Sequence, residues 1–142
     1  MKNAVFTFPV PANEPVKSYL KGSPERVALE AELKRQSSIE LDIPLIIGGK
    51  EVRTGNTGKV VMPHDHAHVL ATYHKAGPEE VRMAIKAALD AHEEWAELDW
   101  TVRASIMLKI ADLLAGKYRA VINAACMLGQ SKNFYQAEID SA

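Results

Sequence analysis

Apolar residues recur at helical spacing through the second half of the chain. From Pro78 onward they repeat every three or four residues, the period of an amphipathic helix. Four helices are therefore expected, over about 78–95, 101–115, 118–128 and 131–142. Gly116 and Gly129 are expected to end the second and third of them. The apolar stripes of these helices are Val81, Ile85, Ala88, His92 and Trp95; Val102, Ile106, Ile110, Leu113 and Leu114; Val121, Ile122, Ala125 and Leu128; and Tyr135, Ile139 and Ala142.

The beginning of the chain has a different pattern. Prolines interrupt residues 1–15, and because each one disfavours helix in the residue before it, these residues are expected to form an extended arm. Ser23-Pro24-Glu25 is typical of a helix start, with serine as the N-cap and proline at the first helical position. This helix is expected to run to about Ser37 on the surface, since its best apolar pair is only Leu29 and Leu33.

Short apolar runs separated by glycines predict a small β portion between these two parts. Residues 45–52 contain two such runs around a glycine pair, which indicates a hairpin. Gly55 and Gly58 are expected to form a further turn, followed by strands over 59–62 and 68–74. The fold class predicted is mainly α with a small β-hairpin portion.

The chain is expected to divide near residue 75. Residues 1–75 would hold the arm, the surface helix and the hairpin region, and residues 76–142 a helical segment. The last helix stops at Ser141-Ala142 without a glycine cap or a basic last turn, so it is expected to be cut short. The helical stripes also need a partner to bury against, and a sheet downstream would supply one.

Composition and charge exclude several classes of function. Across 142 residues, 47% are hydrophobic and 25% are charged, the balance of a soluble globular protein. A net charge of −1 gives no basic footprint for nucleic acid or an anionic membrane, and no apolar run approaches a membrane span. The single cysteine cannot form an internal disulfide, so a reducing compartment is expected. With no signal or transit pattern at the start, we expect a cytoplasmic protein, or a mitochondrial matrix protein if it is processed.

Three sets of residues could carry chemistry, and each also has a simpler structural interpretation. His64-Asp65-His66-Ala67-His68 could place three imidazoles near one metal ion, but Pro63 and the polar composition favour an exposed turn, so no metal site is expected. Cys126 lies in an apolar helical segment and is expected to be a buried, inert thiol. His92 shares an apolar stripe and is expected to be a packed or edge histidine, not a catalytic one.

The sequence does not match the known phosphate-binding loop motifs. Gly58-Lys59 is followed by Val60 where a P-loop needs serine or threonine, and no G-x-G-x-x-G fingerprint occurs. The residues alone therefore indicate a mostly helical segment with no cofactor loop of its own.

Several stretches resemble the pyrroline-5-carboxylate type of the aldehyde dehydrogenase family. They are Pro44-Leu45-Ile46-Ile47-Gly48-Gly49-Lys50-Glu51-Val52-Arg53-Thr54-Gly55, Pro63-His64-Asp65-His66, Met127-Leu128-Gly129-Gln130-Ser131-Lys132 and Gln136-Ala137-Glu138-Ile139-Asp140. The resemblance runs from about residue 20 to the last residue. It implies that the chain is the N-terminal part of an α/β dehydrogenase, ending before the parallel sheet of the NAD-binding domain.

The resemblance also implies a reaction for the parent protein. That family oxidises L-glutamate gamma-semialdehyde to glutamate with NAD in proline breakdown, using a cysteine nucleophile, an asparagine at the oxyanion and a glutamate that activates water. All of these residues, and the phosphate-binding turn, would lie beyond residue 142, so no catalytic or cofactor-binding residue is expected in this chain. The expected partners are the rest of the dehydrogenase, further copies of it in a homo-oligomer, and a small aldehyde substrate.

One residue of this chain is expected near the substrate. The resemblance places Glu138 at the aldehyde entrance, facing the substrate's amino group, and helical spacing puts it about 100° from the stripe of Tyr135 and Ile139. A solvated helix carboxylate is the simpler alternative. For the chain as a whole, the competing hypothesis is a self-contained helical module that binds a protein partner and catalyses nothing.

Overall fold

The computed structural model describes residues 5–8, 10 and 12–141, and over them the chain forms five helices and five strands. The helices are α1 (Pro24–Ser37), α2 (Pro78–Glu97), α3 (Trp100–Ala115), α4 (Arg119–Gln130) and α5 (Phe134–Ser141). The strands are β1 (Leu41–Ile43), β2 (Leu45–Ile47), β3 (Lys50–Val52), β4 (Thr57–Met62) and β5 (Asp65–His74). The predicted fold class, mainly α with a small β portion, is confirmed.

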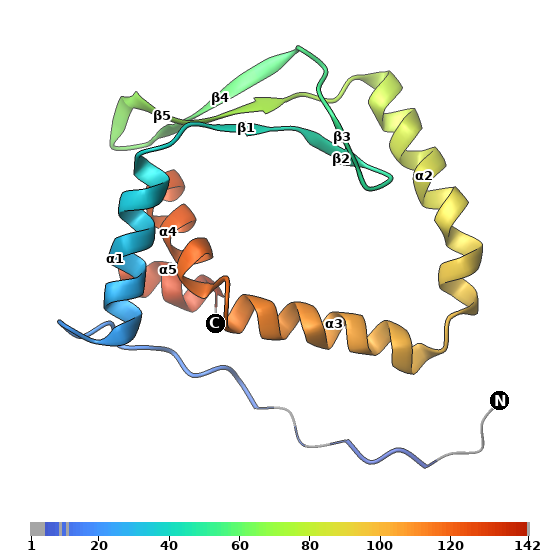
Figure 1. Ribbon diagram of the computed structural model, residues 1–142, viewed down its shortest axis with the longest axis horizontal. Helices are drawn as coiled ribbons and strands as arrows, with labels where there is room; N and C mark the ends of the chain where they lie inside the picture. Colours follow the sequence, from blue (N-terminus) through green and yellow to red (C-terminus); the bar gives the residue numbers. More distant parts are fainter. Residues whose placement is uncertain (1–4, 9, 11, 142) are drawn as a thin grey trace.

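The elements form an open frame (Figure 1). The strands lie along the top of the frame, α2 forms the right side and α3 the bottom. Helices α1, α4 and α5 stand together at the left, and we call this part the corner. The segment before α1 runs past α3 on the outside of the frame. The two halves of the chain meet at the corner, where the Gln36 side-chain amide donates to the Val121 carbonyl at 2.9 Å.

The hairpin is confirmed, and its turn explains the glycine pair. β2 and β3 pair in antiparallel register from Leu45 opposite Val52 to Ile47 opposite Lys50. Gly48 and Gly49 have φ angles of 57° and 74°, the left-handed backbone that a two-residue hairpin turn requires at both central positions.

The second sheet contains a strand that the sequence pattern did not predict. Its order is β1-β5-β4, with β1 parallel to β5 and β4 antiparallel to β5. β1 has only three residues, too few to show a period, and no glycine pair follows it as one follows β2. The prediction that Gly58 forms a turn is wrong: Gly58 lies within β4, opposite Tyr73. A Cβ atom at Gly58 would come within 2.6 Å of the Tyr73 ring, so the glycine makes room for that ring.

Helix α1 begins as predicted and packs on its neighbour α4. The Ser23 side chain caps the helix by accepting from the Arg26 amide at 3.3 Å. Leu29 is buried and forms a small apolar core with Tyr19 and Ala124. Only one side of this surface helix is therefore covered.

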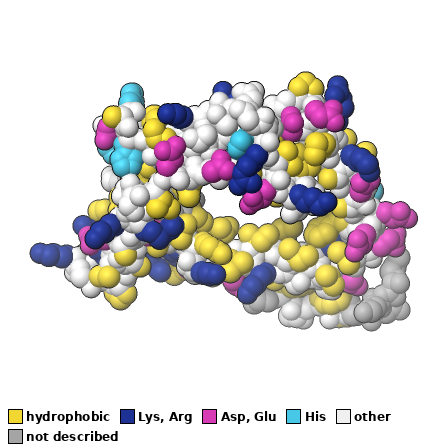
Figure 2. Space-filling model, turned by 45° about the horizontal axis from the view of Figure 1, so that its top comes forward, with side chains coloured by type: hydrophobic (Ala, Val, Ile, Leu, Met, Phe, Trp, Pro, Cys, Tyr) yellow, Lys and Arg dark blue, Asp and Glu magenta, His cyan; other side chains and the backbone are white. Residues whose placement is uncertain are grey.

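Helices α2 and α3 lie where the spacing predicted them but contain no buried residue. The expectation that their stripes need a partner beyond these helices agrees with the structure, because large apolar side chains are exposed and no described element covers these faces. His92 is exposed too, which contradicts a packed histidine and leaves the edge interpretation. Figure 2 shows a band of hydrophobic side chains bordering the opening between the strands and α3. Large apolar side chains exposed on the two helices are Val81, Met83, Ile85, Leu89, Trp95, Trp100, Val102, Ile106, Met107, Leu108, Ile110 and Leu114.

Helices α4 and α5 are buried on faces that the apolar pattern did not indicate. α4 buries Arg119, Asn123 and Ala124, whereas the predicted stripe is only partly covered and Ala125 is exposed. α5 buries Ala137 and Glu138 and leaves Tyr135 and Ile139 exposed. Ala142, the last member of that stripe, is outside the described residues.

The ends of these two helices also differ from the prediction. α4 passes Gly129 and ends at Gln130, where Ser131 adopts the left-handed conformation with φ of 54°. α5 begins only at Phe134, because Asn133 and Gln136 cap it reciprocally: the Gln136 amide donates to the Asn133 side chain at 2.9 Å, and the Asn133 amide donates to the Gln136 side chain at 3.0 Å.

The extended character predicted for residues 1–15 holds for residues 5–8, 10 and 12–15, which contain no helix or strand. Phe6 packs edge-on against Trp100 at a centroid distance of 4.9 Å, and Phe8 lies 5.9 Å from the same ring. Residues 1–4, Pro9 and Pro11 are outside the described part of the chain. Among the helices described, none is both long and apolar enough to cross a membrane.

Candidate functional site

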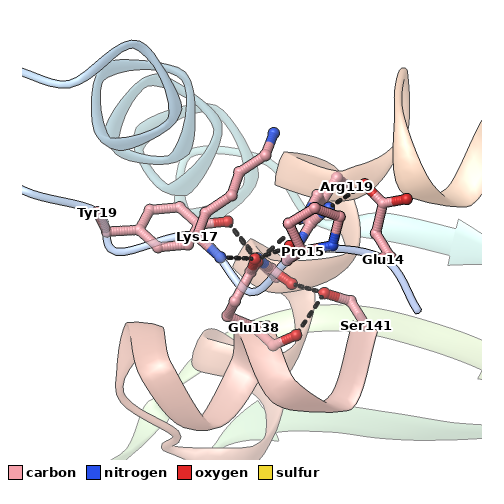
Figure 3. A network of polar contacts seen from close by, with 8 residues as sticks. Glu14, Pro15, Lys17, Tyr19, Arg119, Glu138 and Ser141 are labelled. Atoms are coloured by element: carbon pink, nitrogen blue, oxygen red, sulfur yellow. Dashed lines mark hydrogen bonds and ion pairs between the residues drawn. The ribbon is translucent and has the colours of Figure 1, made fainter. Parts of the chain in front are cut away.

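The candidate site is a buried polar cluster at the corner where α4, α5 and the segment before α1 meet. Glu138 comes from α5, and Arg119 and Asn123 come from α4. Arg119 and Asn123 are four residues apart, so one face of α4 presents both side chains to Glu138. Lys17 and Tyr19 arrive from the extended segment on the opposite side (Figure 3).

The Glu138 carboxylate accepts five hydrogen bonds from four residues. Oε1 accepts from the Lys17 backbone amide at 2.7 Å and from Arg119 Nη2. Oε2 accepts from the Tyr19 hydroxyl at 2.6 Å, from Asn123 Nδ2 at 2.8 Å and from Arg119 Nε at 3.2 Å. Arg119 thus donates to both carboxylate oxygens, in the bidentate geometry that makes such ion pairs strong.

Arg119 also binds the extended segment directly. Its Nη1 donates to the Glu14 carboxylate at 2.9 Å, and its Nη2 donates to the Pro15 carbonyl at 2.6 Å. The cluster is closed on its other side by Ser141, whose hydroxyl donates to Asn123 Oδ1 at 2.5 Å. Among the described residues, every buried side-chain nitrogen and oxygen has a hydrogen-bond partner.

Burial and charge shift the pKa values of the cluster in opposite directions. Burial would raise the pKa of Glu138, but hydrogen bonds from Arg119, Tyr19, Lys17 and Asn123 outweigh it and lower the pKa to about 2. Burial, reinforced by the hydrogen bond to Glu138 and by its charge, raises the pKa of Tyr19 to about 12. The hydrogen bond to Glu138 raises the pKa of Arg119. Near neutral pH Glu138 is therefore a carboxylate, Arg119 a guanidinium and Tyr19 a neutral phenol.

The cluster can hold its elements together, but its carboxylate is not free to do chemistry. Glu138 is 0% exposed, and a carboxylate has about four lone-pair sites, which five donors fill. It therefore cannot serve as a general base for a ligand in this arrangement. The prediction that Glu138 lies at the edge of a buried stripe is wrong in its geometry, since Glu138 is itself buried and the stripe is exposed.

Sequence reasoning did not find Arg119, Asn123 or Tyr19, although two of them left a signal. Arg119 and Asn123 are the polar residues in the first two turns of a largely apolar helix, and they are spaced to share one face. A charged residue inside such a helix is rarely buried without a partner, which would have pointed to an acid elsewhere in the chain. Tyr19 left no comparable signal, because it precedes the first regular element.

The other candidates do not assemble into a site. His64 Nδ1 lies 2.7 Å from the Ser131 hydroxyl, while His66 is exposed on β5. Within the described residues, no three metal-ligating side chains come together. Cys126 is half-buried, not fully buried as expected, because its side of α4 is only partly covered.

The cavity next to the cluster is unsuited to a dinucleotide. It has a volume of about 380 Å³ and shares Glu14 and Ser141 with the cluster. Its charged lining consists of two carboxylates, Glu14 and Asp112, which would repel a pyrophosphate. The residues of this chain therefore do not provide a phosphate-binding site there.

The chain belongs to the aldehyde dehydrogenase family, whose model matches residues 51–142. Within that family it is similar to delta-1-pyrroline-5-carboxylate dehydrogenases. It is 51% identical to the enzyme of that name from Agaricus bisporus over 98% of this chain, and 44% identical to the human mitochondrial enzyme over 92% of this chain. The chain spans about a quarter of the length of these relatives, 26% and 23% respectively.

Solved structures of the same kind share the fold. The delta-pyrroline-5-carboxylate dehydrogenase of Mycobacterium tuberculosis superposes with a TM-score of 0.93 at 45% identity, over 99% of this chain and 26% of that one. A structure of that enzyme bound with NAD superposes with a TM-score of 0.92 over 97% of this chain and 26% of that one. The 1-pyrroline-5-carboxylate dehydrogenase of Thermus thermophilus superposes with a TM-score of 0.87 at 28% identity, over 96% of this chain and 26% of that one.

Proposed function

We propose that these 142 residues form the N-terminal part of an NAD-dependent dehydrogenase that oxidises L-glutamate gamma-semialdehyde to glutamate. The observation that carries the proposal is the match to pyrroline-5-carboxylate dehydrogenases over 98% of this chain, which includes the segment before residue 51 that the family model does not cover. NAD is the proposed cofactor because a relative with the same fold binds it.

The proposed role of this segment is architectural. The exposed faces of α2 and α3 would pack against the remainder of the dehydrogenase, including its NAD-binding sheet, and the complete enzyme would form a homo-oligomer. The nucleophile, the water-activating glutamate and the phosphate-binding turn would come from residues beyond 142. A cytoplasmic or mitochondrial matrix location fits, since several relatives are named mitochondrial.

The expectation that Glu138 lies near the substrate stays a prediction. It gains support from the neighbouring cavity, which could admit a small molecule bearing an ammonium group beside Glu14 and Asp112. It meets an obstacle in the five donors that already fill the carboxylate. A role for Glu138 therefore has to be compatible with these contacts.

The test is to compare the complete protein with the 142-residue polypeptide. The complete protein should reduce NAD with pyrroline-5-carboxylate far faster than with an aliphatic aldehyde of equal length. The 142-residue polypeptide should show no NAD reduction and no NAD binding at submillimolar concentration. A complete protein that fails to oxidise pyrroline-5-carboxylate would refute the substrate, and stoichiometric NAD binding by the short polypeptide in calorimetry would refute the assignment of the cofactor site to other residues.

The competing proposal is a helical module that binds a protein partner, and the exposed faces of α2 and α3 favour it. The two proposals differ in where the partner is encoded. Covering of these faces by residues of the same polypeptide supports the dehydrogenase, whereas faces that stay open in the complete protein support the module. Hydrogen exchange of the α2 and α3 amides in the complete protein distinguishes them.

A further inference from the structure

The extended segment over residues 14–19 lies directly on Glu138, and four of its residues make polar contacts with α4 or α5. The Lys17 amide and the Tyr19 hydroxyl donate to Glu138, while Glu14 and the Pro15 carbonyl accept from Arg119 (Figure 3). We call residues 14–19 the strap. It joins parts of the chain more than a hundred residues apart.

The backbone of the strap is held in an unfavourable conformation. Tyr19 has a φ of 50°, a left-handed geometry that bulky residues rarely adopt. Such geometry persists only where surrounding contacts over-determine it. Here they come from both ends of the side chain: the ring lies 5.9 Å from that of Phe134 and joins the core with Leu29, and the hydroxyl bonds Glu138 and Asn123.

A ligand could reach Glu138 only by displacing these contacts. The carboxylate is 0% exposed and its lone pairs are filled. An incoming ammonium would have to replace the Lys17 amide, the Tyr19 hydroxyl, Asn123 or Arg119. Replacing the Tyr19 hydroxyl, whose proton is donated to Glu138, would leave a buried donor without an acceptor, a cost comparable to the new bond.

We propose that Glu138 is the anchor of the strap, and that it acts on the reaction of the complete enzyme as a positioning residue, by holding residues 14–19 in place, without touching the substrate. Arg119 and Tyr19 are positioning residues with it. The depressed pKa of Glu138 is consistent with this role, because it keeps the anchor ionised at any physiological pH. Only the kinetic part of the inference rests on the proposed function.

The first experiment measures the strap itself in the complete protein. Trypsin sites at Lys17 and Lys21 lie within and just after the strap, so the rate of cleavage there reports its opening. Glu138→Gln and Tyr19→Phe should each speed cleavage by roughly 10- to 100-fold, the equivalent of one charged hydrogen bond. Tyr135→Phe is the matched control, because Tyr135 is exposed on the same helix and its loss should leave the rate unchanged.

The second experiment separates positioning from direct contact. If Glu138 acts through the strap, Glu138→Gln and Tyr19→Phe lower kcat/KM by the same factor for the semialdehyde and for an aliphatic aldehyde without an amino group. A loss confined to the semialdehyde, with cleavage at Lys17 unchanged, would overturn the proposal in favour of direct contact. If Glu138→Gln does not fold, Tyr19→Phe decides by both readouts. If the complete protein oxidises neither aldehyde, the proposed function fails while the cleavage rates still decide the role of the strap.

Discussion

Two regions of this molecule are built on opposite principles. The corner formed by α1, α4, α5 and the strap buries an arginine, a glutamate and an asparagine. Each of their buried side-chain nitrogen and oxygen atoms has a hydrogen-bond partner. The α2–α3 side buries no described residue, although its helices are the longer ones. Helix formation and burial are thus separate outcomes in this chain.

The difference shows what each region needs from elsewhere. The corner draws its partners from residues 14 to 141, so it can be stable by itself. α2 and α3 present apolar side chains that gain stability only when water is removed from them, at about 25 cal/mol for each Å² covered. Their helices satisfy the backbone, but their faces depend on a partner that no described residue supplies.

The largest expected effect is the loss of the corner's central cation. Arg119→Met leaves Glu138 buried and unpaired, which costs about 3–5 kcal/mol. Hydrogen exchange of the α4 and α5 amides should accelerate accordingly, while α2 and α3 amides change little.

Lys86→Met is the control for that experiment. It removes an exposed pair with Asp90 on α2, which contributes less than about 1 kcal/mol. If the two substitutions have equal effects, the corner is not the self-sufficient region described above.

Acid should destabilise the corner more than α2 and α3. The folded pKa of Glu138 is lowered from 4.5 to about 2, so its contribution to stability is complete above pH 4.5 and disappears as pH falls towards about 2. At about 1.4 kcal/mol for each pKa unit, the loss is about 3 kcal/mol. Arg119, Tyr19 and Glu14 are the other titratable groups that face it, and Arg119 stays charged throughout this range.

The same contacts predict a limit at high pH. The folded pKa of Tyr19 is raised from 10 to about 12, so its contribution is complete below pH 10 and disappears as pH rises towards about 12. The free energy of unfolding, measured with urea between pH 2 and pH 12, tests both the loss of stability in acid and the loss in alkali. In Tyr19→Phe the loss of stability between pH 10 and pH 12 should disappear. If the loss persists, Tyr19 is not its cause.

The open side should make the isolated 142-residue polypeptide self-associate. Leu89 is 68% exposed on α2, and burying such a side chain contributes about 1.5–3 kcal/mol. Leu89→Lys should therefore weaken association roughly 10- to 100-fold in sedimentation experiments, with a parallel loss of binding of an apolar dye. A compact monomer at high concentration, with no dye-accessible surface, would show that α2 and α3 find a partner within this chain.

The smallest effect expected is at the start of α1. Ser23→Ala removes the N-cap hydrogen bond to the Arg26 amide and should cost about 1 kcal/mol. Because α1 packs on α4, the loss should appear in the corner and not on the open side. Ser37→Ala, at the other end of the same helix, is the control, because the Ser37 hydroxyl donates only to the Lys34 carbonyl of its own helix, and it should change the free energy of unfolding by less than half as much.

Local rules predicted most of the elements. The Ser23 cap, the two glycines of the hairpin turn and the 3.6-residue period of α2 and α3 act over a few residues, so the sequence by itself determined them. The resemblance of a few motifs to one family was also legible in the sequence, and the match of the family model to residues 51–142 confirmed it.

Tertiary structure decided which faces are buried. The apolar pattern placed Ile85 and Ile106 on faces that need a partner, and these residues are exposed, while Arg119 and Glu138, which the pattern did not indicate, are enclosed. Spacing along a helix defines a face but not the element that will cover it. Bringing Tyr19 onto Glu138 across 119 residues depends on packing that no local pattern encodes, because desolvation and paired charges act only once distant segments meet.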